Sequence, residues 1–406
     1  MQTRPLVALL DEARRRETEA ILRSCVHCGF CNATCPTYQL LGDERDGPRG
    51  RIYLIKQVLE GIPATQITQR HLDRCLTCRA CETTCPSGVA YGQLLDTGRE
   101  IVEQQVGRSL LDFAKRQLLC AILPYRHRFA VFYRFARFFA PIMPHHLRKK
   151  FVCTHATKPD RLRPAHARRV LLLDGCVQPT LAPGINHAAI RVLDKLDIGV
   201  VLAPTAGCCG ALSYHLSAQQ DGLDFMRRNI DAWLPYIDQD IQFIVTTASG
   251  CGLMVKDYGK LLKHNAAYKE KAEQISAAAR DIVEILTAEE LTGLKPQTSA
   301  KLAFQSPCTL QHGQQLNGRV ETLLSRLGFE LMSVPDPHLC CGSAGTYSLM
   351  QPELSEQLLK NKIRALETGQ PDIIVTANIG CQSNLQSATT TPVRHWIEVL
   401  SDAVPD

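Results

Sequence analysis

Two short stretches of the sequence carry four cysteines each at identical spacing. Both follow C-x2-C-x2-C-x3-C and both close with proline; they read "CVHCGFCNATCP" (25–36) and "CLTCRACETTCP" (75–86). Thiolates bind iron–sulfur clusters and zinc, and a reducing compartment keeps them free to do so. A disulfide framework suits small secreted chains and not one of 406 residues. Two complete sets of four at this spacing favour clusters over zinc.

The spacing is similar to that of bacterial two-cluster ferredoxins, in which the fourth cysteine of each run binds the other cluster. The resemblance therefore implies two [4Fe–4S] clusters with crossed ligands. The first would be bound by Cys25, Cys28, Cys31 and Cys85, and the second by Cys75, Cys78, Cys81 and Cys35. The stretch between the runs has helical character, notably in "GPRGRIYLIK" (47–56). This part of the chain thus resembles the helical ferredoxin of respiratory dehydrogenase iron–sulfur subunits.

Eight of the other cysteines form an internal repeat. In each half, one cysteine precedes a Cys-Cys-Gly triplet and one follows it. The two sets are Cys176, Cys208, Cys209 and Cys251, and Cys308, Cys340, Cys341 and Cys381. Apolar runs such as "RRVLLLDGC" and "AKLAFQSPC" lead into the cysteines, and helical segments lie between them. Each half is therefore predicted to be an α/β unit with a mostly parallel sheet and its cysteines at the carboxyl ends of strands.

The repeat resembles the cysteine-rich CCG domain. That family includes one of the subunits of heterodisulfide reductase, together with iron–sulfur subunits of complexes that act on glycerol 3-phosphate, lactate or glycolate. Some members carry C-x-x-C at the end of each unit, but here Ala248 and Asn378 occupy the first of those positions. The eight cysteines could accordingly hold a further cluster or zinc, or remain buried unliganded thiols. A helical two-cluster module followed by two CCG units most resembles the glycolate oxidase iron–sulfur subunit family.

This resemblance implies an electron-transfer subunit of a flavin-dependent glycolate dehydrogenase or oxidase complex. A partner FAD subunit would oxidise glycolate to glyoxylate, and this chain would pass the electrons to a membrane quinone-type acceptor. The alternatives are an iron–sulfur subunit of a lactate or glycerol-3-phosphate dehydrogenase complex, and a heterodisulfide-reductase-like enzyme. The sequence holds no nucleotide or flavin fingerprint and no nucleophile–base pair, so no catalytic residue is expected on this chain.

A basic and aromatic stretch separates the two cysteine-rich parts. Residues 113–159 contain no acidic residue. A helical period would place Val131, Phe135, Phe138, Phe139 and Ile142 on one face. Such a helix suits the surface of an anionic bilayer, and the alternative is a linker helix packed on protein. The candidate membrane contacts are Arg134, Phe135, Arg137, Phe138 and Phe139. Cys120 and Cys153, in the same stretch, are expected to be packed thiols.

Composition limits the remaining function classes. The net charge of +6, from 46 basic and 40 acidic residues, is too small to indicate nucleic-acid binding. No apolar run is long enough to cross a bilayer and no signal-peptide pattern is present, so we expect a cytoplasmic protein that associates peripherally with the inner face of the cell membrane.

The expected fold is α+β and multidomain. An N-terminal α-helical ferredoxin-like domain precedes two pseudo-repeated α/β CCG domains. The predicted boundaries are 1–105 for the two-cluster domain, 106–165 for the basic linker, 166–295 for the first CCG domain and 296–406 for the second.

Overall fold

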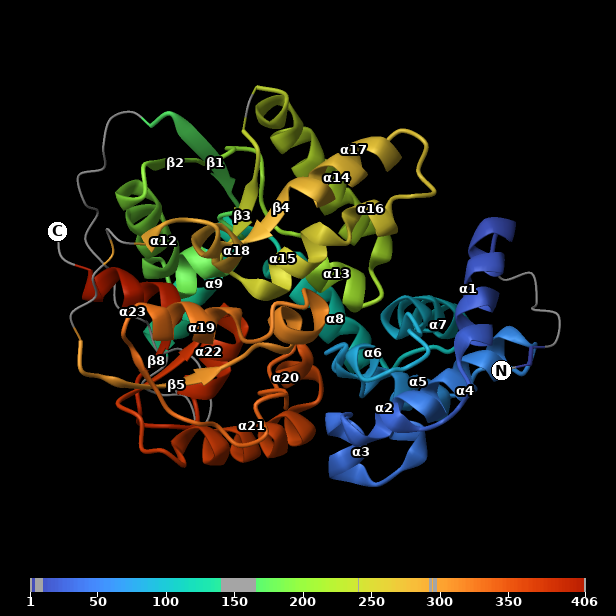
Figure 1. Ribbon diagram of the computed structural model, residues 1–406. Coiled ribbons are helices and arrows are strands. Elements are labelled where there is room, and N and C mark those ends of the chain that lie inside the picture. Colours follow the sequence, from blue (N-terminus) through green and yellow to red (C-terminus); the bar gives the residue numbers. More distant parts are fainter. Residues whose placement is uncertain are drawn as a thin grey trace. The chain divides into compact units, whose positions relative to one another are not determined.

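The computed structural model describes residues 2–3, 10–139, 166–239, 241–291, 294 and 298–404 (Figure 1). Ile142 and Cys153 of the basic stretch lie outside these residues. The chain forms two compact units, which are described separately. Unit 1 comprises Met1–Arg116 and His338–Leu358, and unit 2 comprises Gln117–Pro337 and Leu359–Asp406. A segment from the second half of the repeat thus belongs to the same unit as the N-terminal module.

Unit 1 is helical in its described residues. Its helices are α1 (Glu12–Ser24), α2 (Phe30–Ala33), α3 (Pro36–Leu41), η1 (Glu44–Asp46), α4 (Pro48–Leu59), α5 (Gln66–Asp73), α6 (Ala80–Thr83), α7 (Tyr91–Gln105) and α20 (Tyr347–Met350). Two more, α8 (Leu110–Ile122) and α21 (Pro352–Glu367), run from unit 1 into unit 2. The core is built from α1, α4, α5 and α7, whose Leu22, Ile55, Leu72 and Leu94 are buried. This helical core carries both cysteine runs.

Local sequence sets the helix ends between the two runs. Pro48 begins α4, where its missing N–H has no intrahelical partner to lose. At the start of α5, Thr65 and Thr68 form a capping box in which each side chain serves the other's backbone N–H. Both helices fall on stretches that the sequence marks as helical.

Unit 2 contains two four-stranded parallel sheets of the same topology. Their strand orders are β2-β1-β3-β4 and β6-β5-β7-β8. The strands are β1 (Arg168–Leu172), β2 (Ile198–Val201), β3 (Ile244–Thr246), β4 (Ala279–Asp281), β5 (Lys301–Gln305), β6 (Glu330–Leu331), β7 (Ile373–Thr376) and β8 (Val393–His395). In register, Leu171 pairs with Val201 and Ile244, while Leu302 pairs with Leu331 and Ile373. The repeated topology confirms the predicted α+β class with two α/β repeats.

The helices of unit 2 cover these sheets (Figure 1). They are α9 (Arg126–Phe139), α11 (Gln178–Leu181), α12 (Gly184–Lys195), α13 (Ala211–His215), α14 (Gln219–Ile237), α15 (Ser249–Lys256), α16 (Tyr258–Leu261), α17 (Lys269–Ala278), α18 (Ile282–Thr287), η5 (Thr309–Gly313), α19 (Arg319–Arg326), α22 (Ile379–Gln386) and α23 (Trp396–Ala403). One hydrophobic core contains side chains of both repeats, among them Ile185, Ile282, Leu302 and Trp396. The two sheets of unit 2 therefore share one hydrophobic core.

Candidate iron–sulfur sites

The eight cysteines of the two N-terminal runs line two cavities in unit 1. The first cavity is lined by Cys25, Cys28, Cys31 and Cys85. The second cavity is lined by Cys35, Cys75, Cys78 and Cys81, and Cys81 also borders the first. Each cavity therefore combines three cysteines of one run with the fourth cysteine of the other. This is the grouping that the resemblance to two-cluster ferredoxins implies.

Left-handed backbone bends each run around its cavity. In the first run His27 and Gly29 have φ values of 59° and 86°, and in the second Thr77 and Arg79 have 55° and 59°. Residues other than glycine rarely adopt such angles. Their recurrence at equivalent places shows that the two runs share one loop conformation. This conformation lets the Thr77 amide donate to Cys75 Sγ at 3.5 Å.

The short helices α2 and α6 bring the fourth cysteine of each run to the opposite cavity. Thr34 donates from Oγ1 to the Ala80 carbonyl at 3.4 Å, and the Thr84 hydroxyl donates to Thr34 Oγ1 at 3.2 Å. Cys35 and Cys85 directly follow these threonines in sequence. The threonine contacts therefore hold the two cysteine runs together next to the residues that exchange cavities, Cys35 and Cys85.

Polar groups surround the sulfurs of the second cavity. Tyr91 Oη donates to Cys75 Sγ at 3.5 Å, and Arg51 Nη1 lies 4.0 Å from Cys35 Sγ. Burial, and after it the charge of Cys75, raises the pKa of Tyr91 well above its usual value, so the phenol keeps its proton for this bond. Donors to sulfur are one of the means by which proteins set cluster potentials.

Sequence reasoning missed Tyr91 as part of the site, and it linked the arginines of "GPRGRIYLIK" (47–56), Arg51 among them, to a cluster only through the backbone. A signal for Arg51 was nevertheless present, because it lies on the same face of α4 as the buried Ile52, Ile55 and Leu59. Burying a charge costs free energy unless a partner compensates it. A charged residue at a core position of an amphipathic helix therefore predicts a buried partner nearby.

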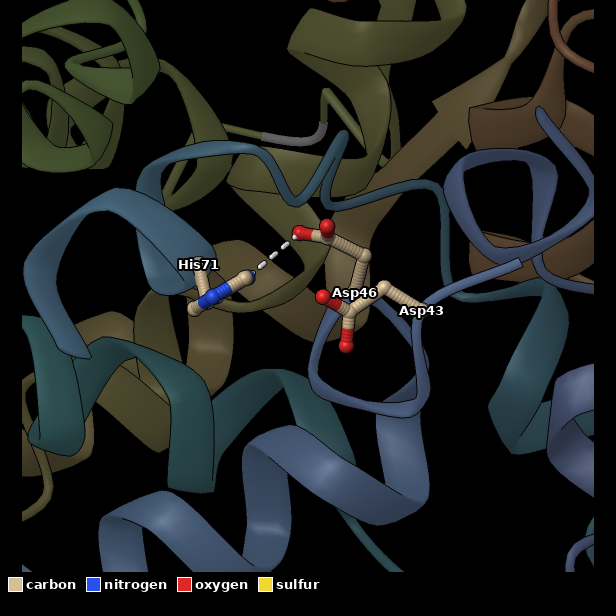
Figure 2. A group of neighbouring side chains, drawn as sticks. All are labelled: Asp43, Asp46 and His71. Atoms are coloured by element: carbon tan, nitrogen blue, oxygen red, sulfur yellow. Dashed lines mark hydrogen bonds and ion pairs between the residues drawn. The ribbon is translucent and has the colours of Figure 1, made fainter. Parts of the chain in front are cut away.

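Three other potential ligands of unit 1, Asp43, Asp46 and His71, lie close together (Figure 2). Ligand atoms of Asp43, Asp46 and His71 lie within 4.8 Å of one another. His71 Nδ1 is 2.9 Å from Asp46 Oδ1 and donates to it, since a carboxylate can only accept. Arg74 also binds Asp46, at 2.9 Å, and Arg45 binds Asp43 at 2.7 Å. Because arginines already balance both carboxylates, this group is an ion-paired network and not a metal site.

The four cysteines of the first repeat meet in unit 2. They follow β1, β2 and β3, so they lie beyond the carboxyl ends of neighbouring parallel strands. The four thiols perturb one another. Cys176 and Cys209 raise the pKa of Cys208, and Cys209 raises that of Cys251. Cys208 and Cys251 in turn hold the pKa of Cys209 well below its usual value.

The glycine of each Cys-Cys-Gly triplet is required by its backbone. Gly210 and Gly342 have φ values of 88° and 82°. A Cβ would meet the Gly222 carbonyl oxygen at 2.6 Å from Gly210, and the Ser355 carbonyl oxygen at 2.5 Å from Gly342. In both triplets the glycine N–H donates to the first cysteine, at 3.5 Å for Cys208 and 3.4 Å for Cys340. The two Cys-Cys-Gly triplets therefore share the same backbone conformation and the same hydrogen bond to sulfur.

The cysteines of the second repeat are divided between the units. Cys308 and Cys381 follow β5 and β7 in unit 2, whereas Cys340 and Cys341 belong to unit 1. Asn378 is the N-cap of α22, and its Nδ2 donates to Cys381 Sγ at 3.6 Å. Asn378 therefore contacts the Cys381 sulfur from the position that a cysteine occupies in the C-x-x-C pattern.

Helix α9 exposes most of its aromatic residues. The face that packs onto unit 2 consists of Phe129, Tyr133 and Ala136. The face predicted to be apolar lies outward, with Phe135 63% and Phe138 77% exposed. The candidate contacts Arg134, Phe135, Arg137, Phe138 and Phe139 are all exposed. Cys120 of α8 is half-buried. Among the described residues, no helix has the length and apolar character needed to cross a bilayer.

Comparison with known proteins decides the family. Residues 170–256 and 302–386 match the cysteine-rich CCG domain, and residues 21–89 match the 4Fe-4S dicluster domain. Over 404 residues the chain is 56% identical to the glycolate oxidase iron-sulfur subunit of Escherichia coli (strain K12), covering 100% of this chain and 99% of that protein. The chain belongs to the glycolate oxidase iron–sulfur subunit family. Its membership and its cysteine content establish it as a carrier of iron–sulfur clusters.

More distant relatives are consistent with this family. The probable glycolate oxidase iron-sulfur subunit of Bacillus subtilis (strain 168) is 31% identical, covering 91% of this chain and 90% of that protein. Lactate utilization protein A of Geobacillus thermodenitrificans (strain NG80-2) is 25% identical, covering 57% of this chain and 98% of that protein. A crystal structure of a hypothetical protein from Helicobacter pylori has a TM-score of 0.56 at 9% identity, covering 98% of this chain and 74% of that one. That likeness shows the fold alone.

Proposed function

We propose that this chain is the electron-transfer subunit of a glycolate-oxidising flavoprotein complex. A flavin on a partner subunit takes two electrons from glycolate, leaving glyoxylate, and the clusters of this chain accept them one at a time. The electrons leave for a membrane quinone-type acceptor. The observation that carries the proposal is the pair of cavities in a member of this family, each lined by three cysteines of one run and the fourth cysteine of the other.

The ligand assignment within this proposal follows the cavities. Cys25, Cys28, Cys31 and Cys85 would hold one [4Fe–4S] cluster, and Cys75, Cys78, Cys81 and Cys35 the other. The cysteine sulfurs suit iron, and the hydrogen-bond donors at Cys35 and Cys75 suit the negative charge of a reduced cluster. When bound, the clusters supply one-electron redox chemistry. The chain's own residues hold them, orient them and limit their contact with water.

The repeat offers a further candidate site. Because Cys176, Cys208, Cys209 and Cys251 follow three neighbouring strands and their thiols perturb one another's pKa, they are placed to bind one more cluster or a zinc ion. Cys308, Cys340, Cys341 and Cys381 are the corresponding candidates in the second repeat.

We propose glycolate rather than lactate as the substrate of the complex. The glycolate oxidase subunit of Escherichia coli matches the whole chain, whereas the lactate utilization proteins match little more than half of it. The exposed arginines and phenylalanines of α9 support peripheral contact with an anionic membrane. We place the complex at the inner face of the cell membrane.

The test is a metal and electron count on the anaerobically purified chain together with its flavoprotein partner. Iron without zinc, and cluster EPR signals that appear when glycolate is added to the complex, are the expected results. The same signals from this chain with glycolate but without the partner would show that it oxidises substrate itself. Zinc without iron would reject the proposal.

A further inference from the structure

One fully buried cation lies against the second cavity. Arg51 of α4 is 0% exposed and lines the cavity of Cys35, Cys75, Cys78 and Cys81. The first cavity is instead bordered by Arg49, whose side chain is 35% exposed and paired with Glu44 at 2.6 Å. The two cavities therefore differ in the fixed charge at their walls.

Arg51 is held rigidly by groups on three sides. Its Nε donates to the His71 carbonyl at 2.7 Å, and its Nη2 donates to Thr37 Oγ1 at 3.1 Å. The remaining nitrogen, Nη1, lies 4.0 Å from Cys35 Sγ. With its fork fixed in this way the guanidinium cannot turn away from the sulfurs when their charge changes.

The Arg51 charge is only partly balanced. Asp46 Oδ1 lies 3.6 Å from Arg51 Nη2. The same carboxylate accepts from His71 (Figure 2) and from Arg74. A guanidinium does not deprotonate in proteins, so the Arg51 side chain stays cationic although it is buried.

We infer that Arg51 raises the reduction potential of the cluster held in the second cavity, and that Asp46 opposes it. A cluster gains one negative charge when it takes up an electron, so a fixed cation beside it favours the reduced form and a fixed anion disfavours it. In a buried site water screens such charges little. This inference rests on the proposed function, because it concerns the cluster that the second cavity would bind.

The test is an EPR-monitored redox titration of the full chain. The signal to follow is the one that Cys78→Ala abolishes. Arg51→Met should lower the reduced-to-oxidised ratio of that cluster at a given potential at least about tenfold, which is ~59 mV for a one-electron couple. Asp46→Asn should shift the potential in the opposite direction, and Arg51→Lys should stay closer to wild type because it keeps the charge.

Arg49→Met is the matched control, two residues away on the same helix. It should move this potential much less than Arg51→Met, because water and Glu44 screen the Arg49 charge. Equal potentials in wild type and Arg51→Met would overturn the inference. If Arg51→Met fails to take up the cluster, an unchanged potential in Asp46→Asn would overturn it as well.

The outcomes separate the two proposals. A wild-type chain without clusters would refute the proposed function and the inference together. A wild-type chain whose clusters are reduced through the partner, with no change of potential in either variant, would refute only the role of Arg51.

Discussion

The hydroxyl of Tyr347 donates to the backbone carbonyl of Arg74 at 3.1 Å, across 273 positions of sequence. Tyr347 is buried and follows the Cys-Cys-Gly triplet of the second repeat, whereas Arg74 directly precedes Cys75. Burial, and then the charges of Cys75 and Cys340, raise the pKa of this phenol. Within unit 1, the triplet of the repeat therefore lies near the second cavity.

The Tyr347→Phe variant tests how much the hydrogen bond between Tyr347 and the Arg74 carbonyl contributes to stability. Removing the hydroxyl leaves the carbonyl of the half-buried Arg74 without this donor, which should cost ~1 kcal/mol of folding free energy and lower the thermal midpoint by ~2–4 °C. Tyr53→Phe is the control, because Tyr53 lies on α4 of the same unit and is 48% exposed. Calorimetry of both variants should show a loss for Tyr347→Phe alone. Equal midpoints in the two would show that the bond contributes nothing measurable.

The crossing of the two runs makes a prediction about pairs of variants. Cys35→Ala should abolish the same EPR signal as Cys78→Ala, although Cys35 belongs to the other run. Cys85→Ala should likewise match Cys28→Ala. Cys120→Ala should retain both signals, since Cys120 lines neither cavity. Matching of Cys35→Ala with Cys28→Ala would mean that each run binds its own cluster.

His395 predicts how stability depends on pH. Its Nε2 donates to the Thr247 carbonyl at 2.8 Å and its Nδ1 accepts from the Ile397 amide at 3.2 Å, so both nitrogens are used by the neutral ring. Burial lowers its pKa to about 4 from 6.5. A lowered pKa means that the native state binds this proton less readily than the unfolded chain. Its stabilising contribution is therefore full above about pH 6.5 and is lost as the pH falls toward 4, by about 3 kcal/mol.

Denaturant unfolding of wild type and His395→Asn, at about pH 7.5 and about pH 4.5, measures this contribution. Asparagine retains an acceptor for the Ile397 amide but does not titrate. The acid-induced loss of unfolding free energy should be smaller in the variant. An equal loss in both proteins would place the acid sensitivity elsewhere in the chain.

The exposed face of α9 predicts membrane binding that depends on charge. Reversing Arg134 and Arg137 to glutamate should weaken sedimentation with anionic vesicles about thirtyfold, since each basic residue at such a surface contributes ~1 kcal/mol. Lys269→Glu with Lys271→Glu makes the same charge change on exposed positions of α17 and should have little effect. If the α9 variant and wild type bind vesicles equally, the exposed face of α9 contacts another protein surface rather than a membrane.

Much of the fold could be predicted because its signals are local. Apolar runs ending at Cys176 and Cys308 predict buried parallel strands, and the structure has β1 and β5 there. The spacing of the two runs, through its resemblance to two-cluster ferredoxins, likewise predicts which cysteines line each cavity. What local pattern could not supply was the direction of the apolar face of α9. That helix is aromatic on several sides, so periodicity alone could not show that Tyr133 would be buried and Phe138 exposed.

The surroundings of the second cavity could not be predicted for a related reason. The role of Arg51 depends on contacts with Thr37 and with the His71 backbone, which are distant in sequence. The association of Tyr347 with the N-terminal unit depends on a still more distant contact. Sequence periodicity identifies the buried face of an element, but it does not identify the partner that covers that face.

The crossed cysteines also determine the order in which the sites are completed during synthesis. Cys25, Cys28 and Cys31 leave the ribosome first, yet the fourth cysteine at their cavity, Cys85, emerges after every member of the other set. At usual elongation rates the delay is roughly 3–10 s. During that interval the thiols of Cys25, Cys28 and Cys31 lack the fourth cysteine of their cavity. The cavity begun first is thus finished last, and its cysteines face the longest exposure to oxidants before iron can be inserted.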